Sequence, residues 1–276
     1  VMVDKVQAQI DTANDRLKAL GAEHANIGGK IGQTERSVMR STQTEGALGA
    51  LLRDYEAAKT AYAETKSKLN NSMMAKNIDA GIGRLATFQL SDGGLGYWQG
   101  DQYASEWGTS YAGHFMLEAE KLGYELPSGF KSNWIRYQRT AAQNWSDKNQ
   151  SSQYEQAYRL YTLAVAGKSE ISAMNRLKEL KTLSVQTKWR LAATYAIAGQ
   201  AEVAKELIAN AGIEVQKYQE LDETFGDDIR DKAMILEAMV LLDKKTQGVK
   251  LLEQIAAGLS EQKWMSTQTT SYCLIA

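Results

Sequence analysis

The sequence predicts an all-α protein in two parts, and three observations support this. No segment keeps the alternation of apolar and polar residues that marks a half-buried strand. The chain has 276 residues and only one proline, so little in it interrupts a helix. Aromatic residues are segregated: residues 1–76 hold only Tyr55 and Tyr62, whereas all six tryptophans lie between residues 98 and 264. We expect an aromatic-poor helical part followed by a part with a packed core.

Residues 1–75 are predicted to form a coiled-coil helical hairpin. Apolar positions recur in steps of three and four in two runs, as in a heptad repeat. They are Val3, Val6, Ile10, Ala13, Leu17 and Leu20, then Leu48, Leu52, Tyr55, Lys59, Tyr62, Lys66 and Leu69. Glycines lie between the runs, within residues 28–32 and again in RSTQTEGALG (residues 40–49). Each interior helix glycine costs roughly 1 kcal/mol relative to alanine, so we place the turn in one of these stretches. A pair of helices this short should need a partner or self-associate.

The second helix of this hairpin carries a family resemblance. The stretch STQTEGALGALLRDYEAAKTAYAETKSKLNNS resembles the periplasmic coiled-coil arm of bacterial polysaccharide chain-length determinant proteins. The likeness covers about seventy residues and rests on a helical pattern. The membrane helices that flank this arm in that family are missing from this sequence. The resemblance implies a scaffold in polysaccharide export as one alternative function.

Residues 76–276 are predicted to form a series of helices. NIDAGIGRLATFQL (residues 77–90) has apolar residues on one helical face, and the next helix spans Trp107–Lys121, with Gly123 as its stop. Further helices are expected at 130–145, 151–166, 170–181, 185–198, 200–211, 227–242, 246–258 and 267–276. Similar segments recur at roughly 35–45 residues, the size of a helix pair. The repetition favours a closed ring of helix pairs or an open superhelix.

The loop SDGGLGYWQG (residues 91–100) stands out because it holds four glycines in a helical protein. Gly93 and Gly94 permit backbone angles that other residues resist, and Gly94→Val should destabilise the domain if φ is positive at Gly94. Tyr97 and Trp98 are placed to cover the edge of a ring. We interpret Asp92, Gly93, Gly94, Tyr97 and Trp98 as a structural loop, with a ligand site as the alternative.

The second part carries a further resemblance, spread over several motifs. They are NIDAGIGRLATFQLSDGGLGYWQGDQYASEWGTSYAGHFMLEAEKLGYELP, SNWIRYQRTAAQNW, QAYRLYTLAVAG, KWRLAATYAIAGQ, FGDDIRDKAMILEAMVLL and WMSTQTTSYCLIA. In this order they resemble the thioester domain of bacterial α2-macroglobulin-like proteins. The resemblance implies an α/α toroid of paired helices. It also implies a periplasmic, often lipid-anchored protein whose internal Cys–Gln thioester acylates a lysine of an attacking protease.

The residues for that chemistry are missing. A thioester of this kind needs Cys-x-Glu-Gln, but the one cysteine, Cys273, is followed by Leu-Ile-Ala. We expect Cys273 to be a buried, inert thiol. Residues 76–276 are therefore predicted to be a truncated toroid without its thioester, joined to a helical arm by recombination, by engineering, or in a natural paralogue. Proteases or other protein domains are the expected partners, and we expect no enzymatic activity.

Two other constellations suggest chemistry. Asp227, Asp228 and Asp231 spell the D-D-x-x-D motif that holds Mg²⁺ against a diphosphate in isoprenoid synthases, which is a second alternative function. The same acids equally suit the start of a helix. His114 and Glu118 share a helical face and are a conceivable general-base pair, although a core histidine fits the pattern better.

Composition excludes several classes of function. The formal net charge is −1, so a basic footprint for nucleic acid is absent. Two histidines and one cysteine are too few for an ordinary zinc site, and we expect no cofactor or metal. No apolar run approaches the ~18 residues of a membrane helix. The N-terminal stretch shows no signal-peptide pattern, so an envelope location is implied only by the two resemblances.

Overall fold

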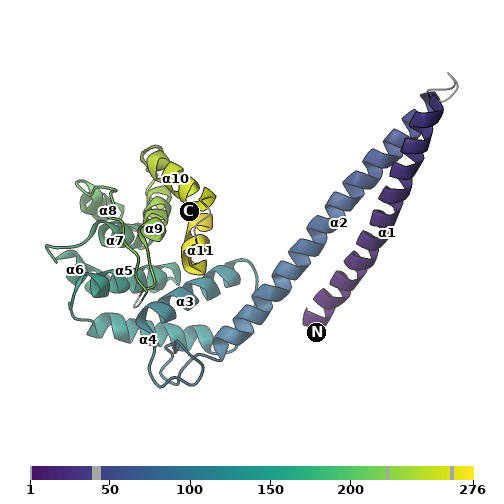
Figure 1. The fold of residues 1–276 in the computed structure, drawn as a ribbon. Coiled ribbons are helices and arrows are strands. Elements are labelled where there is room, and N and C mark those ends of the chain that lie inside the picture. The colour runs from purple at the N-terminus through teal and green to yellow at the C-terminus, as the bar shows by residue number, and fades with distance from the viewer. Residues whose placement is uncertain (1, 39–44, 222–223, 262–263) are drawn as a thin grey trace. The chain divides into compact units, whose positions relative to one another are not determined.

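The computed structural model describes residues 2–38, 45–221, 224–261 and 264–276. These residues form eleven α-helices, with two isolated β-bridges and no strand among them. The chain divides into two compact units, Val1–Gly83 and Arg84–Ala276 (Figure 1). The all-α prediction is confirmed. The predicted division between residues 75 and 76 lies inside a helix that continues to Ala86.

The first unit is a pair of long helices that lie side by side (Figure 1). Helix α1 spans Met2–Val38, and α2 spans Glu45–Ala86 and supplies the other half of the unit up to Gly83. The glycines at positions 28–32 therefore lie within α1. The helix boundaries fall at the second of the two predicted stretches, and residues 39–44 lie outside the described residues. The sequence NIDAGIGRLATFQL is not a separate helix, because α2 runs through its first part without a break.

The two helices face each other along heptad positions, but some of the predicted positions are exposed. On α1 the covered positions continue the predicted run, without Val3, which is exposed. They are Val6, Ile10, Ala13, Leu17, Leu20, His24, Ile27, Ile31 and Thr34. On α2 the predicted Lys59 and Lys66 are exposed, as is Leu52, and Ala58 and Thr65 take the heptad places beside Tyr55 and Tyr62. The side chain of Leu48 lies outside the described residues. A lysine keeps its ammonium in water, so the neighbouring small residue turns inward instead. Interlocked coiled-coil packing along this seam stays a prediction.

The second unit is a toroid-like set of alternating inner and outer helices. The inner helices are α3 (Glu106–Lys121), α5 (Gln150–Val165), α7 (Val185–Ile197), α9 (Asp228–Leu241) and α11 (Thr267–Ile275). The outer helices are α4 (Phe130–Asn144), α6 (Ile171–Lys178), α8 (Ala201–Ile208) and α10 (Lys245–Ser260). Each inner helix packs against the next inner one. Tyr111 of α3 meets Tyr272 of α11 with ring centroids 5.8 Å apart, which brings the first and last inner helices together.

The start and end signals of the inner helices explain the sequence repetition. Every inner helix begins with a side-chain cap that accepts a backbone hydrogen bond, whereas the outer helices have no side-chain cap. The caps are Ser105, Asn149, Ser184, Asp227 and Ser266. After α3, α5 and α7 the chain turns at Gly123, Gly167 and Gly199, all with positive φ. The predicted helix boundaries of this unit match the observed ones to within a few residues.

Candidate functional site

The glycine-rich loop before α3 is braced from within and from the helices beneath it. The carboxylate of Asp92 accepts a hydrogen bond from the Gly94 amide at 2.9 Å, and Asp101 accepts one from the Trp98 amide at 2.7 Å. The hydroxyl of Thr109 on α3 bonds both the amide and the carbonyl of Leu95. This network supports the interpretation of the segment as a structural loop.

Its two central glycines are needed for different reasons. Gly93 has φ +101°, and a Cβ there would lie 2.1 Å from the carbonyl oxygen of Asn133 on α4. Gly94 does not have positive φ, so the condition set for a strained backbone there is not met. A Cβ on Gly94 would instead lie 2.5 Å from that of Ala104 and 2.8 Å from the ring of Tyr137. Close packing, rather than backbone angle, excludes a side chain at Gly94.

The aromatic residues of the loop behave differently from each other. Tyr97 is half exposed and stacks on Phe225, from the segment before α9, with centroids 5.4 Å apart. Trp98 is 70% exposed and touches Tyr97 edge-on. Tyr97 thus joins two loops at the rim of the ring, and Trp98 stands in solvent.

The centre of the ring holds a buried ion pair that the sequence reasoning missed. Arg190 of α7 donates a hydrogen bond to Glu237 of α9 at 2.8 Å, and the Tyr161 hydroxyl donates to the other carboxylate oxygen at 2.7 Å. The guanidinium of Arg190 also lies 4.3 Å from the centroid of the Tyr161 ring. Burial alone raises the pKa of Glu237, but Arg190 and its other neighbours outweigh burial, so the pKa lies below its usual value. Glu237 is therefore held as a carboxylate.

His114 lies beside this pair as a buried core histidine. Its Nδ1 is 3.1 Å from the Tyr158 hydroxyl, which also contacts the Tyr272 hydroxyl. Its Nε2 is 3.8 Å from a carboxylate oxygen of Glu118, whose side chain is 46% exposed. Burial lowers the pKa of His114, against the opposing effect of Glu237. The structure thus places the predicted His114–Glu118 pair together, but the imidazole is enclosed by tyrosines.

A second buried arginine organises the aspartate motif. Arg230 donates to Asp231 at 2.8 Å, and its guanidinium lies 4.6 Å from the centroid of the Trp107 ring. The Tyr218 hydroxyl donates to the other oxygen of Asp231 at 2.7 Å. Both oxygens of Asp231 are thus occupied by protein donors.

The other two acids of the motif also have partners within the protein. Asp227 caps α9 by accepting from the Arg230 amide at 2.7 Å, and its second oxygen accepts from the Thr269 hydroxyl at 2.9 Å. Asp228 pairs with Lys232 at 2.9 Å. Within the described residues no group of three or more His, Cys, Asp or Glu side chains is arranged to hold a metal ion. The three aspartates start and anchor a helix, as one of the two interpretations expected.

Cys273 is a free, buried thiol on α11. Burial raises its pKa to about 11, so the reactive thiolate is scarce at neutral pH. The position on a covered helical face agrees with the predicted inert cysteine.

Arg190 and Glu237 each lie in a sequence pattern that indicates a buried charge. Arg190 stands in WRLAATYAIAG and Glu237 in AMILEAMVLL, so each is the single charge within an apolar helical stretch. Such a charge lies on the buried face and needs a partner of opposite sign. The pairing of these two residues across helices was not readable from spacing, because 47 positions separate them.

The alternating inner and outer helices place the second unit in a class of fold, the α/α toroids built on paired helices. No protein-family model matches the chain. Alpha-2-macroglobulin of Escherichia coli strain K12 is 25% identical over 219 residues, which cover 72% of this chain and 13% of that protein. The chain therefore has an alpha-2-macroglobulin-like relationship, and it spans about an eighth of the length of that relative.

Solved structures agree on the fold. A crystal structure of native E. coli alpha-2-macroglobulin, from domain MG7 to the C-terminus, matches with TM-score 0.63 and 20% identity over 78% of this chain and 34% of that one. Trypsin-activated E. coli alpha-2-macroglobulin matches with TM-score 0.62 and 23% identity over 76% of this chain and 15% of that one. Salmonella alpha-2-macroglobulin reacted with methylamine matches with TM-score 0.62 and 20% identity over 78% of this chain and 14% of that one.

Proposed function

We propose that the chain is a non-catalytic part of a bacterial alpha-2-macroglobulin-like protease-trapping protein of the cell envelope. In this proposal residues 76–276 supply a binding or structural module without a functional thioester. The relationship to E. coli alpha-2-macroglobulin supports the family, and one of the similar structures is of the trypsin-activated protein.

The observation that carries the proposal is the state of Cys273. A thioester forms when a cysteine thiol condenses with a glutamine side-chain amide and ammonia leaves. Cys273 is the one cysteine, it has no Glu-Gln after it, and it is buried. The charged groups of the ring centre are engaged with one another, so they offer no free nucleophile.

The experiment that tests this combines intact mass with protease challenge. The purified chain should have the mass of its sequence, and its thiol should react with a thiol reagent only after unfolding. A mass lower by one ammonia, or a denaturation-resistant adduct with trypsin, contradicts the proposal. Mg²⁺-dependent binding of an isoprenoid diphosphate contradicts it in favour of the enzyme alternative.

A further inference from the structure

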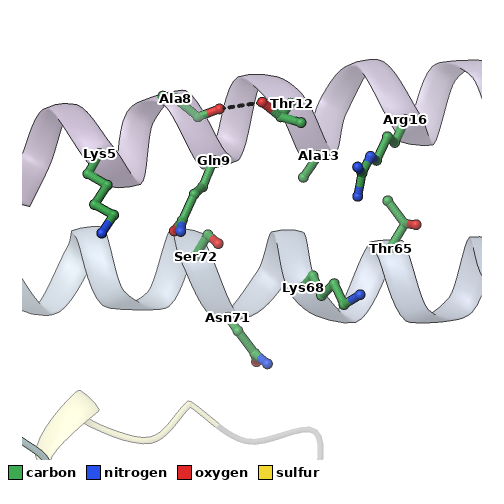
Figure 2. Close-up of a pocket in the computed structure, with 10 residues that line it drawn as sticks. All are labelled: Lys5, Ala8, Gln9, Thr12, Ala13, Arg16, Thr65, Lys68, Asn71 and Ser72. Carbon is green, nitrogen blue, oxygen red and sulfur yellow. Dashed lines mark hydrogen bonds between the residues drawn. The ribbon is translucent and has the colours of Figure 1, made fainter.

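The first unit contains a groove between its two helices. It has a volume of about 600 Å³. Six residues of α1 and four of α2 line it: Lys5, Ala8, Gln9, Thr12, Ala13, Arg16, Thr65, Lys68, Asn71 and Ser72 (Figure 2). Lys5, Gln9 and Arg16 extend from α1 towards α2, while most of the other lining side chains are short (Figure 2). The lining holds three cations and no carboxylate, so an occupant that places carboxylates opposite these cations complements it.

The two helices cover little of each other around this groove. Ile10, Ile27, Ala58 and Ile82 are the buried apolar residues among the described part of the first unit. Lys5, Asp15, Arg16 and Lys68 form no ion pair with any other described residue. A helix pair with so small a buried surface gains stability when a further helix covers it.

The sequence of α1 itself contains a complementary helix. Lys5 and Arg16 are 11 positions apart, and so are Asp4 and Asp15. At 1.5 Å per residue each pair spans roughly 16 Å of helix. All four side chains are exposed. If two copies of α1 run antiparallel about residue 10, Lys5 faces Asp15 of the other copy, and Arg16 faces Asp4.

The residues between these charges suit a close contact. In the same register Ala8 faces Thr12, and both are small and exposed. The Thr12 hydroxyl is satisfied by the Ala8 carbonyl at 2.8 Å, so it brings no unpaired polar group to an interface. Small residues at the crossing point let two helix backbones approach each other. Charges at both ends fix the register and direction of the pair.

We propose that α1 of a second copy lies antiparallel in this groove and joins two hairpins in a two-fold dimer. The contact is isologous, so each of the two charge pairs occurs twice. Lys68 of α2 adds a third cation to the lining of the groove. The occupant of the groove is thus another molecule of the same chain.

Two charge-reversed variants of the full chain, studied separately and as a mixture, test the proposed dimer. Variant A carries Lys5→Glu and Arg16→Glu, and variant B carries Asp4→Lys and Asp15→Lys. In either variant alone like charges face each other, so analytical ultracentrifugation should show dimerisation weakened roughly tenfold or more relative to the wild type. In an equimolar mixture of A and B all four pairs become attractive again. The mixture should therefore form heterodimers.

The matched control is Lys30→Glu, an exposed cation of α1 that lies outside the segment from Asp4 to Arg16 that carries the proposed charge pairs. It should dimerise like the wild type, and circular dichroism should show unchanged helix content in all variants. A monomeric wild type overturns the proposal, as does dimerisation that survives in both A and B. A mixture of A and B that stays monomeric also overturns it, because general damage to folding would not be repaired by mixing.

Discussion

Single residues at the centre of the ring combine charge with deep burial. The side chain of Arg190 is fully buried and that of Glu237 is 16% exposed, and Glu237 accepts hydrogen bonds from both Arg190 and Tyr161. A buried pair of this kind adds little net stability relative to an apolar pair, but loss of one partner leaves an uncompensated charge. The ring centre is therefore sensitive to any substitution that removes only one charge.

Replacing Glu237 with Gln should lower the free energy of unfolding by roughly 3 kcal/mol, because Arg190 stays charged and loses its carboxylate. Urea unfolding followed by tryptophan fluorescence measures this. The control is Glu253→Gln, an exposed acid on α10, which should leave the midpoint unchanged. Equal losses in the two variants contradict the proposed importance of the pair.

His114 gives the ring a defined response to acid. Its folded-state pKa is lowered, chiefly by burial, whereas the unfolded chain has a pKa near 6.5. The unfolded state therefore binds protons first as the pH falls, and the contribution of His114 to stability, complete above about pH 6.5, decreases below it. His114→Gln should flatten this loss of stability between about pH 7 and about pH 5.

The measurement is the urea midpoint at several pH values for the wild type and His114→Gln. The folded-state pKa of Glu237 is also lowered. The stability that this carboxylate contributes is therefore lost as the pH falls from its unfolded-state pKa through its folded-state pKa. An unchanged slope in the histidine variant shows that another group causes the acid response.

At the scale of elements, the loop from Gln89 to Ser105 shows how a helical protein uses glycine. Gly93 and Gly94 let the chain pass directly over α4 and the Tyr137 ring. Gly100 also has positive φ, but a Cβ there meets no atom within 4 Å. Gly100 thus needs only the positive φ, Gly94 needs only the missing side chain, and Gly93 needs both.

Gly93→Ala should destabilise the second unit more than Gly100→Ala. Both substitutions place alanine at positive φ, which costs on the order of 1 kcal/mol. Only Gly93→Ala also forces the Asn133 carbonyl on α4 away, which adds about 1–3 kcal/mol. Thermal unfolding monitored by tryptophan fluorescence should show the larger decrease in Tm for Gly93→Ala, and a reversed order contradicts this account.

Helices were predictable in this protein because their signals are local. Each signal lies next to the helix end that it marks. The N-caps Ser105, Asn149 and Ser184 begin helices, and Gly123, Gly167 and Gly199 follow helix C-termini. Spacing did not distinguish Lys59 from Ala58 at the seam, since both keep heptad steps between Tyr55 and Tyr62; the residue type does, because the ammonium of Lys59 stays in water. The Arg190–Glu237 and Tyr97–Phe225 contacts join distant segments, so spacing alone did not reveal them.

At the scale of the whole molecule, the two units differ in what stabilises them. The second unit has a continuous buried core, whereas the first buries four apolar residues among its described part. All six tryptophans belong to the second unit. Two spectroscopic signals therefore report on different parts of the chain.

Thermal unfolding should occur in two steps. Far-ultraviolet circular dichroism, which follows all helices, should show an early loss of signal that tryptophan fluorescence does not show. If the first unit dimerises, this early step should move to higher temperature as the protein concentration rises. Coincident transitions by the two probes contradict separate unfolding of the units.

The solitary, covered sulfur of Cys273 also makes the native chain convenient for site-directed labelling. Maleimide dyes or nitroxide spin labels react with the thiolate, which burial makes scarce on this residue. A cysteine introduced on the surface of each unit would consequently take up the reporter while the endogenous sulfur stays unmodified. Interprobe distances between hairpin and ring become measurable in solution without first removing the native cysteine.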